Sequence, residues 1–258
     1  MSTIFRKPME NYQGRHIGCA PGTHAALVDM VRRNIDPSSR VMDIGAHSGA
    51  LLLRLQTLGF SDLVGTDLDN TRFDVPGAEF CQLDLNYPFF AKFSKNFHLI
   101  TATEVIEHLD SPREFLTQIR RLLDVDGWLA ISLPNVGFWE GRLKFLIKGE
   151  LWGFGENNYR TQRHISPITP EQMILMMQEI GFKVIEFRTA GSFATVLKTA
   201  ISFPLWLFFR LIGGSSVIGE SAIYLARKAD PDPDLKRPMH YRNRWQGVAD
   251  RIGINAES

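Results

Sequence analysis

The stretch that decides the fold is Val41-Met42-Asp43-Ile44-Gly45-Ala46-His47-Ser48-Gly49. A short apolar run ends in a carboxylate and a loop of small residues, and helical spacing of apolar residues follows from about Ser48 to Gly59. This pattern is typical of a buried strand that passes through a tight loop into a helix. At such a junction a ligand can approach the backbone and meet free N–H groups. Residues 43–49 are therefore either a ligand-binding loop or an ordinary tight turn.

The pattern on both sides of this loop predicts alternating strands and helices. The expected strands are residues 41–45, 63–67, 79–83, 97–102, 128–133, 182–188 and 221–226. The expected helices are residues 23–34, 48–59, 112–123 and 170–181, of which the last two follow Ser111 and Thr169 at capping-box spacing. Such alternation indicates an α/β protein with a mainly parallel, doubly wound sheet. Two long connections, 136–168 and 191–219, interrupt it.

Composition and charge argue against several classes of protein. With 44% apolar and 22% charged residues, the 258-residue chain has the composition of a globular protein. Its 29 basic residues nearly balance its 28 acidic ones, so we expect no nucleic-acid partner. Cys19 and Cys81 lie far apart, which argues against a disulfide or zinc–thiolate scaffold and fits a reducing cytoplasm. We also expect no signal peptide and no membrane-spanning run.

The loop discriminates between nucleotide ligands. In a dinucleotide-binding fingerprint its key positions would be Gly45, His47 and Ala50, so a pyrophosphate would meet an imidazole. A P-loop is excluded because no Gly-Lys-Ser or Gly-Lys-Thr follows. An adenosyl ligand without phosphates remains. Asp67, at the end of the second strand, would accept hydrogen bonds from a ribose diol, and Asp84 would bind the adenine amino group.

These motifs resemble those of class I S-adenosylmethionine-dependent methyltransferases. Asp43, Gly45 and Gly49 match the first motif of that family, and His47 replaces its middle glycine. The resemblance runs from about residue 40 to residue 228 and is nearest to bacterial quinone-biosynthesis and cell-surface-glycan enzymes. Four further stretches carry it: Gly65–Leu68, Cys81–Leu85, Phe97–Leu109 (with His98 where Asp is usual) and Gly127–Asn135.

The resemblance implies a Rossmann-like fold with a seven-stranded sheet whose last strand is antiparallel. The domain would span residues 37–228, after an N-terminal helical lead-in (1–36) and before a C-terminal tail (229–258). The cofactor would be S-adenosylmethionine, bound by Asp43, Gly45, Ala46, His47, Gly49, Asp67, Leu68, Asp84, Leu85 and Glu104. The expected reaction is O-methylation of a small-molecule, glycan or lipid-linked acceptor. A non-catalytic adenosyl-binding module and an NAD-dependent oxidoreductase are the alternatives.

Glu104, Glu107 and His108 follow the fourth strand and would share one face of a helical turn beginning there. Three interpretations stay open: a structural cluster that positions cofactor and backbone, an acid–base site in which His108 takes the acceptor proton, or a site for Mg or another divalent ion. The run resembles the Glu-Glu-His metal sites of ubiquinone and small-RNA O-methyltransferases. Some of these add a downstream histidine, and His164 is its counterpart here. The candidate catalytic residues are His108, Glu107 and His164, and the candidate metal ligands are the same three with Glu104.

The two long connections carry most of the unexplained apolar residues. Residues 136–168 combine aromatic side chains with cations, which suits a sugar, a quinol or a lipid-linked phosphate; a satellite hydrophobic cluster is the alternative. Residues 193–212 contain only Lys198 and Arg210 as charged residues and are interrupted by Pro204. We expect this segment to lie in a membrane interface or to cover a hydrophobic acceptor, unless it forms a second core or a dimer face. The expected location is the cytoplasm, with the inner face of the membrane as the alternative.

Overall fold

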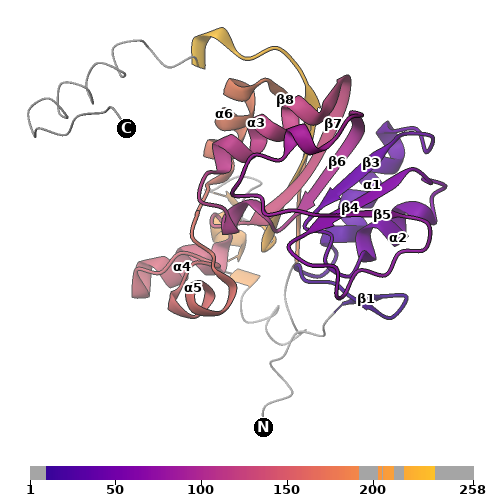
Figure 1. Ribbon diagram of the computed structural model, residues 1–258. Helices are drawn as coiled ribbons and strands as arrows, with labels where there is room; N and C mark the ends of the chain where they lie inside the picture. The colour runs from indigo at the N-terminus through magenta and orange to yellow at the C-terminus, as the bar shows by residue number, and fades with distance from the viewer. Residues whose placement is uncertain (1–9, 192–202, 205, 212–217, 236–258) are drawn as a thin grey trace, which may run out of the picture.

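In the computed structural model, the described part of the chain comprises residues 10–191, 203–204, 206–211 and 218–235. Its centre is a seven-stranded sheet in the order β5-β4-β3-β6-β7-β9-β8, as Figure 1 shows. The strands are β3 (Val41–Ile44), β4 (Leu63–Asp67), β5 (Glu79–Gln82), β6 (Phe97–Thr103), β7 (Leu123–Pro134), β8 (Phe182–Ala190) and β9 (Ser221–Lys228). Only β9 runs antiparallel to its neighbours, β7 and β8. The predicted fold class, including the antiparallel last strand, is confirmed.

Helices cover both faces of the sheet, because each strand sends apolar side chains alternately to either side. The helices α3 (Pro112–Leu122) and α6 (Pro170–Ile180) pack on the core that contains Met42 and Ile44. The helices α1 (Thr23–Asn34) and α2 (Ala50–Gln56) pack on the opposite core, which contains Val41. The short elements are the hairpin β1 (Asn11–Tyr12) and β2 (Arg15–His16) and the 3₁₀ turns η1 (Phe90–Lys92), η2 (Ile106–His108) and η4 (Pro233–Leu235).

Both predicted caps are formed. The Ser111 hydroxyl accepts a hydrogen bond from the backbone N–H of Glu114, at the start of α3. Thr169 and Gln172 exchange side-chain and backbone hydrogen bonds in a complete capping box. Gly181 then ends α6 in the left-handed region at φ 106°. These local signals fix where the two helices of one layer begin and end.

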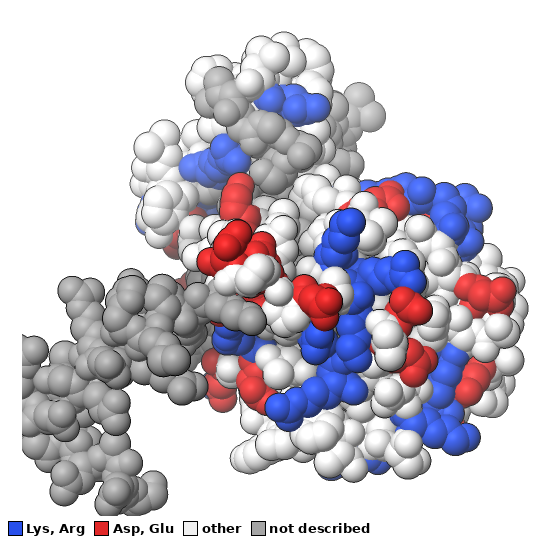
Figure 2. Space-filling model, turned by 90° about the horizontal axis from the view of Figure 1, so that it is seen from above, with Lys and Arg blue, Asp and Glu red and all other residues white. Residues whose placement is uncertain are grey.

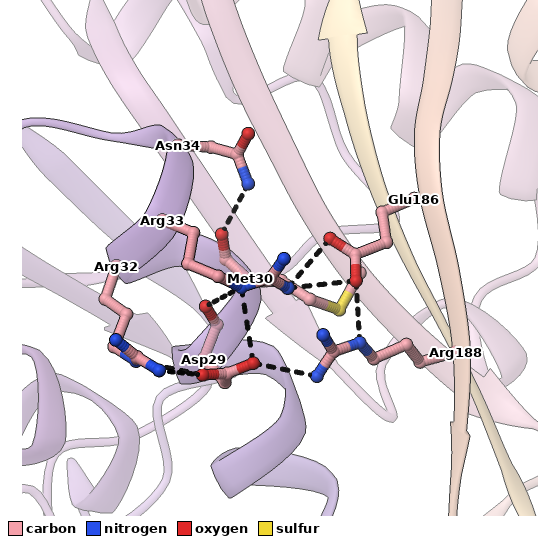
Figure 3. A network of polar contacts seen from close by, with 7 residues as sticks. All are labelled: Asp29, Met30, Arg32, Arg33, Asn34, Glu186 and Arg188. Carbon is pink, nitrogen blue, oxygen red and sulfur yellow. Dashed lines mark hydrogen bonds and ion pairs between the residues drawn. The ribbon is translucent and has the colours of Figure 1, made fainter.

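The helix α1, which lies within the expected lead-in (1–36), packs on the sheet. Leu27, Met30 and Val31 lie in the same core as side chains of β3 and β9. An ion-pair network also joins α1 to the edge strand β8, as Figure 3 shows. In it Arg188 binds Asp29 at 2.9 Å and Arg33 binds Glu186 at 2.9 Å. Since these pairs are partly exposed, apolar packing contributes more to the attachment than charge does.

The strand β7 begins earlier than predicted. Leu123 pairs with Phe97, and the next pair joins Trp128 to Leu99. Residues 124–127 of β7 therefore lie opposite His98 alone, in an irregular bulge. Asp126-Gly127, a dipeptide typical of turns, lies inside this bulge. A bulge accommodates extra residues in one strand, while the strands remain paired on both sides of it.

The first long connection contains two helices that the sequence did not predict, α4 (Trp139–Lys148) and α5 (Glu156–Gln162). Figure 1 places both beyond the end of β7, away from the helices that cover the sheet. Of the segment 193–212 singled out in the sequence, residues 193–202, 205 and 212 lie outside the described residues, as do 213–217 and the tail beyond residue 235. Among the residues that are described, no helix is long and apolar enough to cross a membrane.

Figure 2 shows basic and acidic side chains interspersed on the face of the molecule seen from above. Ion pairs of the protein include Arg40 with Asp62 at 3.2 Å and Arg227 with Asp126 at 2.7 Å. The mixture of charges agrees with the near-zero net charge of the sequence.

Candidate functional site

A cavity of about 580 Å³ opens at the carboxyl ends of the parallel strands, where open α/β sheets bind their ligands. Its size falls within the roughly 300–1,000 Å³ of small-molecule sites. Its walls come from the N-terminal segment, the loop after β3, the ends of β4 and β5, the segment after β6, and α5. The lining includes His16, Cys19, His24, Asp43, Gly45, Ala46, His47, Ser48, Asp67, Leu68, Asp84, Leu85, Glu104, His108, Gln162 and Arg163.

Nine of the ten predicted cofactor residues line this cavity, and Gly49 does not. Gly49 has a φ of +78°, and a Cβ added to it would lie 2.1 Å from a methyl carbon of Val75. The glycine is therefore required for packing and backbone conformation, rather than to let a ligand approach. Gly45 is under a similar constraint, since its φ is +73° and an added Cβ would lie 2.4 Å from Val105.

His47 occupies a backbone conformation that favours glycine, with φ at +48°. Its backbone N–H donates to Asp67 Oδ2 at 2.8 Å, while the N–H of Leu68 donates to Oδ1 at 2.7 Å. These two bonds fix the Asp67 carboxylate at the cavity wall and leave further lone pairs for a ligand hydroxyl. Asp84, after β5, lines the same wall, as expected for carboxylates that follow neighbouring parallel strands.

The His47 ring is held by Arg72. The guanidinium donates to His47 Nε2 at 2.8 Å, so the ring proton resides on Nδ1, because Arg is only a donor. Burial, followed by the charge of Arg72, lowers the pKa of His47. The ring is therefore neutral at physiological pH, and its Nδ1 is buried without a hydrogen-bond partner, where the family pattern has glycine.

Asp43 ends β3 and is buried beneath the loop. Thr101, its neighbour on β6, donates its hydroxyl to Asp43 Oδ1 at 2.6 Å. Burial raises the pKa of this carboxyl to about 7, although the Thr101 bond opposes the shift. The carboxyl group of Asp43 therefore gains or loses its proton near neutral pH.

Glu104 does not share a helical face with Glu107 and His108, contrary to the sequence expectation. It has a φ of +53°, which turns the chain before the 3₁₀ turn η2 begins. Its Oε1 accepts hydrogen bonds from Ser132 at 3.0 Å and Ser221 at 2.6 Å. Two neighbouring strands therefore fix this carboxylate at the cavity wall. Burial raises its pKa despite the two bonds.

Glu107, His108 and His164 come together beside the cavity, with ligand-type atoms within 4.8 Å of one another. Of the three, only His108 lines the cavity. Glu107 is fully buried, and neither of its carboxylate oxygens has a hydrogen-bond partner. Burial raises its pKa well above the usual value, and the charge of Glu104 adds to the shift. The imidazole of His108 lies nearby, with its Nε2 3.9 Å from Glu107 Oε1.

His164 reaches this cluster from the end of the first long connection. Its Nδ1 lies 2.7 Å from the carbonyl oxygen of Gly153 and must donate to it, which leaves Nε2 as the acceptor atom. Burial, together with the neighbouring His108, lowers the pKa of His164. The ring is therefore neutral, with one nitrogen free to bind a proton or a cation.

The N-terminal segment contributes wall residues that the sequence did not single out. His24, at the start of α1, is buried, its Nδ1 has no partner, and burial lowers its pKa to about 3. Cys19 lies nearby, and burial, with the charge of Glu104, raises its pKa to about 12. Both side chains are thus neutral and close the cavity from one side. Gln162 and Arg163 close it from the end of α5.

A sheet of this order, with carboxylates after successive strands lining a cavity at its carboxyl edge, defines the class I S-adenosylmethionine-dependent methyltransferase architecture. The profile of a family described as "Methyltransferase domain" matches residues 18–187, which is more than half of the chain. The chain therefore belongs to that family. The match begins before α1, in agreement with the packing of α1 on the sheet. A search of curated proteins finds no match.

Solved structures with this fold include several methyltransferases. A putative methyltransferase from Bacillus halodurans C-125 is 17% identical, with a TM-score of 0.55, over 80% of this chain and 99% of that one. Magnesium protoporphyrin IX methyltransferase from Synechocystis PCC 6803, solved with bound SAH, is 13% identical, with a TM-score of 0.54, over 80% of this chain and 82% of that one. An S-adenosylmethionine-dependent methyltransferase from Mesorhizobium loti is 14% identical, with a TM-score of 0.51, over 80% of this chain and all of that one. At these identities the likeness concerns the fold.

Proposed function

We propose that this protein transfers the methyl group of S-adenosylmethionine to an oxygen of a glycan, a small molecule or a lipid-linked acceptor. The observation that carries the proposal is that one cavity has Asp84, Asp67, Glu104 and His108 in its lining. Three carboxylates suit the adenine, ribose and methionine parts of the cofactor. His108 then stands where an acceptor would meet the methyl group.

In the proposed reaction, the acceptor oxygen attacks the methyl carbon in line with the bond to sulfur. The new O–CH₃ bond forms as the S–CH₃ bond breaks, and S-adenosylhomocysteine leaves. His108 takes the acceptor proton, and the neighbouring Glu107 and His164 orient its ring. Holding both reactants in a closed cavity supplies much of the rate enhancement. The base contributes when the acceptor must lose its proton during attack.

A second role for the cluster, binding of a divalent ion such as Mg²⁺, is favoured by the buried Glu107 carboxylate. A buried carboxylate with two unpartnered oxygens is costly, and a cation would compensate for that cost. Glu107, His108 and His164 Nε2 fit such an ion by type and spacing, whereas Glu104 is bonded to two serines. When bound, the ion would supply a Lewis acid at the acceptor end of the cavity.

The proposed function is tested by supplying the protein with labelled S-adenosylmethionine and extracts of a strain that lacks its gene. Methylated glycans, lipids and small molecules are then compared by mass spectrometry with and without the protein. We expect a new product, heavier by one methyl group on oxygen. If no extract fraction becomes methylated, although the protein binds the cofactor, a non-catalytic adenosyl-binding module replaces the proposal.

A further inference from the structure

The two long connections pack against each other beyond the end of β7. Phe138 and Trp139 are buried there, and Trp152 and the segment 206–211, through Trp206 and Phe209, pack around them. The Phe138 ring meets that of Trp152 at a centroid distance of 5.2 Å. Residues 138–152, 203–204 and 206–211 thus form one small unit, here called the apolar module. Figure 1 shows that its helix α4 projects away from the layers that cover the sheet.

The module exposes apolar side chains on its outer surface. In the described part of the chain, 13 large apolar side chains are exposed, and seven of these belong to the module. The other six are scattered singly over different elements, as is normal for a protein surface. Several exposed apolar side chains within one small unit are typical of a contact surface. The seven are Phe145, Leu146, Ile147, Phe203, Leu207, Phe208 and Leu211.

The charges of the module have one sign next to these side chains. The cations of the module are Arg142, Lys144, Lys148 and Arg210, and its acidic residues are Glu140 and Glu150. Lys148 directly follows Ile147, and Arg210 directly precedes Leu211, so long cationic side chains flank the exposed apolar ones. Glu150 pairs with Lys144 at 2.7 Å. Apolar side chains flanked by Lys and Arg are typical of segments that lie in the interface of an anionic bilayer.

The connection that carries α4 also forms part of the cavity wall. Gln162, the last residue of α5, and Arg163, directly after it, line the cavity, and α4 and α5 belong to the same connection. His164 Nδ1 also bonds to the carbonyl of Gly153, directly after Trp152. A surface to which the module binds would therefore lie near the part of the cavity wall that Gln162 and Arg163 form.

We propose that the apolar module docks on an anionic lipid surface, with the seven exposed apolar side chains among the acyl chains and the cations at the headgroups. This extends the membrane contact expected for 193–212 to α4. The docking itself does not depend on methyl transfer, whereas its use to reach a lipid-linked acceptor rests on the proposed function. A second copy of the chain is the competing occupant, but like cations would then face one another across the contact.

Vesicle sedimentation of the full chain, without cofactor or acceptor, tests the docking. Vesicles of phosphatidylcholine alone are compared with vesicles that also contain phosphatidylglycerol. The test variant is Leu146→Glu with Ile147→Glu, because these side chains are 80% and 70% exposed and their loss should not unfold the chain. The matched control is Val125→Glu with Leu175→Glu, two exposed apolar residues elsewhere on the surface. Circular dichroism and S-adenosylhomocysteine binding verify that each variant is folded.

We expect the wild type and the control variant to sediment with phosphatidylglycerol vesicles. The test variant should bind these vesicles roughly tenfold or more weakly, since it exchanges two apolar side chains for charges. Binding should also weaken with salt and on phosphatidylcholine alone. The proposal is overturned if the wild type ignores phosphatidylglycerol vesicles, or if both variants bind equally well. It is equally overturned if sedimentation velocity without lipid detects a dimer that the test variant abolishes while vesicle binding persists.

Discussion

The imidazole rings of His108 and His164 meet edge to face, with their centroids 4.8 Å apart. One ring follows the strand β6 and the other ends the first long connection, so the fold brings two distant segments together. The buried carboxyl group of Glu107 belongs to the same cluster. This arrangement joins the cavity residue His108 to the connection that also carries α4.

Replacing His108 by Ala should lower the turnover for methyl transfer by roughly 10²–10⁴, the usual contribution of a general base. His98→Ala is the matched control, because His98 lies on β6 in the same stretch of the family pattern (97–109) but does not line the cavity. Under the acid–base role, a chelator leaves the wild-type rate unchanged. Loss of the rate in chelator, followed by recovery with Mg²⁺ or another divalent ion, would instead assign the cluster to metal binding.

Glu107→Gln should change how stability depends on pH. The folded pKa of Glu107 lies well above its unfolded value near 4.5, so the native state binds the extra proton. The free energy of unfolding of the wild type should therefore decrease as pH rises above that value, by at most about 1.4 kcal/mol per pH unit from this group. Urea unfolding at a series of pH values should give a shallower decrease for Glu107→Gln. Asp43 and Glu104 remain in both proteins, so the difference between the curves reports Glu107.

The exposed Glu156 supplies the control for that series. It pairs with Arg160 at 2.8 Å on the surface, so Glu156→Gln should follow the wild-type curve. Identical pH dependence of the wild type and Glu107→Gln would mean that Glu107 is ionised in the folded protein. Its charge would then need a partner, and a bound cation would become the explanation.

Gly49→Ala should destabilise the protein more than Gly77→Ala does. Both glycines have nearly the same φ, +78° and +77°, but an added Cβ meets Val75 only at Gly49. The conformational cost, about 1–2 kcal/mol, is thus common to both variants. The overlap with Val75 should add about 1–3 kcal/mol at Gly49. Equal unfolding free energies in urea would show that the space around Gly49 relaxes at no cost.

The sheet and the cofactor loop were predictable because their signals are local. Alternating burial, caps at Ser111 and Thr169, and carboxylates at strand ends all appear within short stretches of sequence. The turn at Glu104 was not predictable, since a left-handed conformation at a glutamate depends on Ser132 and Ser221 from other strands. For the same reason, nothing near His24 indicates that α1 carries it to the cavity.

The helices α4 and α5 were missed for a different reason. Most apolar residues of α4 remain exposed, so they do not follow the one-sided spacing of a helix that packs on a core. The bulge in β7 could not be predicted, because Asp-Gly is typical of turns and only the pairing with β6 shows that the strand continues on both sides. In each case the deciding contact lies far away in the sequence.

Calorimetric titration with S-adenosylhomocysteine tests the central claim most directly, since it needs no acceptor. We expect saturable binding of one ligand per chain and no binding of NAD. Asp67→Ala should weaken the affinity by roughly 5- to 150-fold, through loss of about 1–3 kcal/mol of hydrogen bonding. Asp69→Ala should not, because the Asp69 carboxylate bonds to Thr71 outside the cavity lining. Binding of NAD, or S-adenosylhomocysteine binding that Asp67→Ala leaves undiminished, would contradict the account.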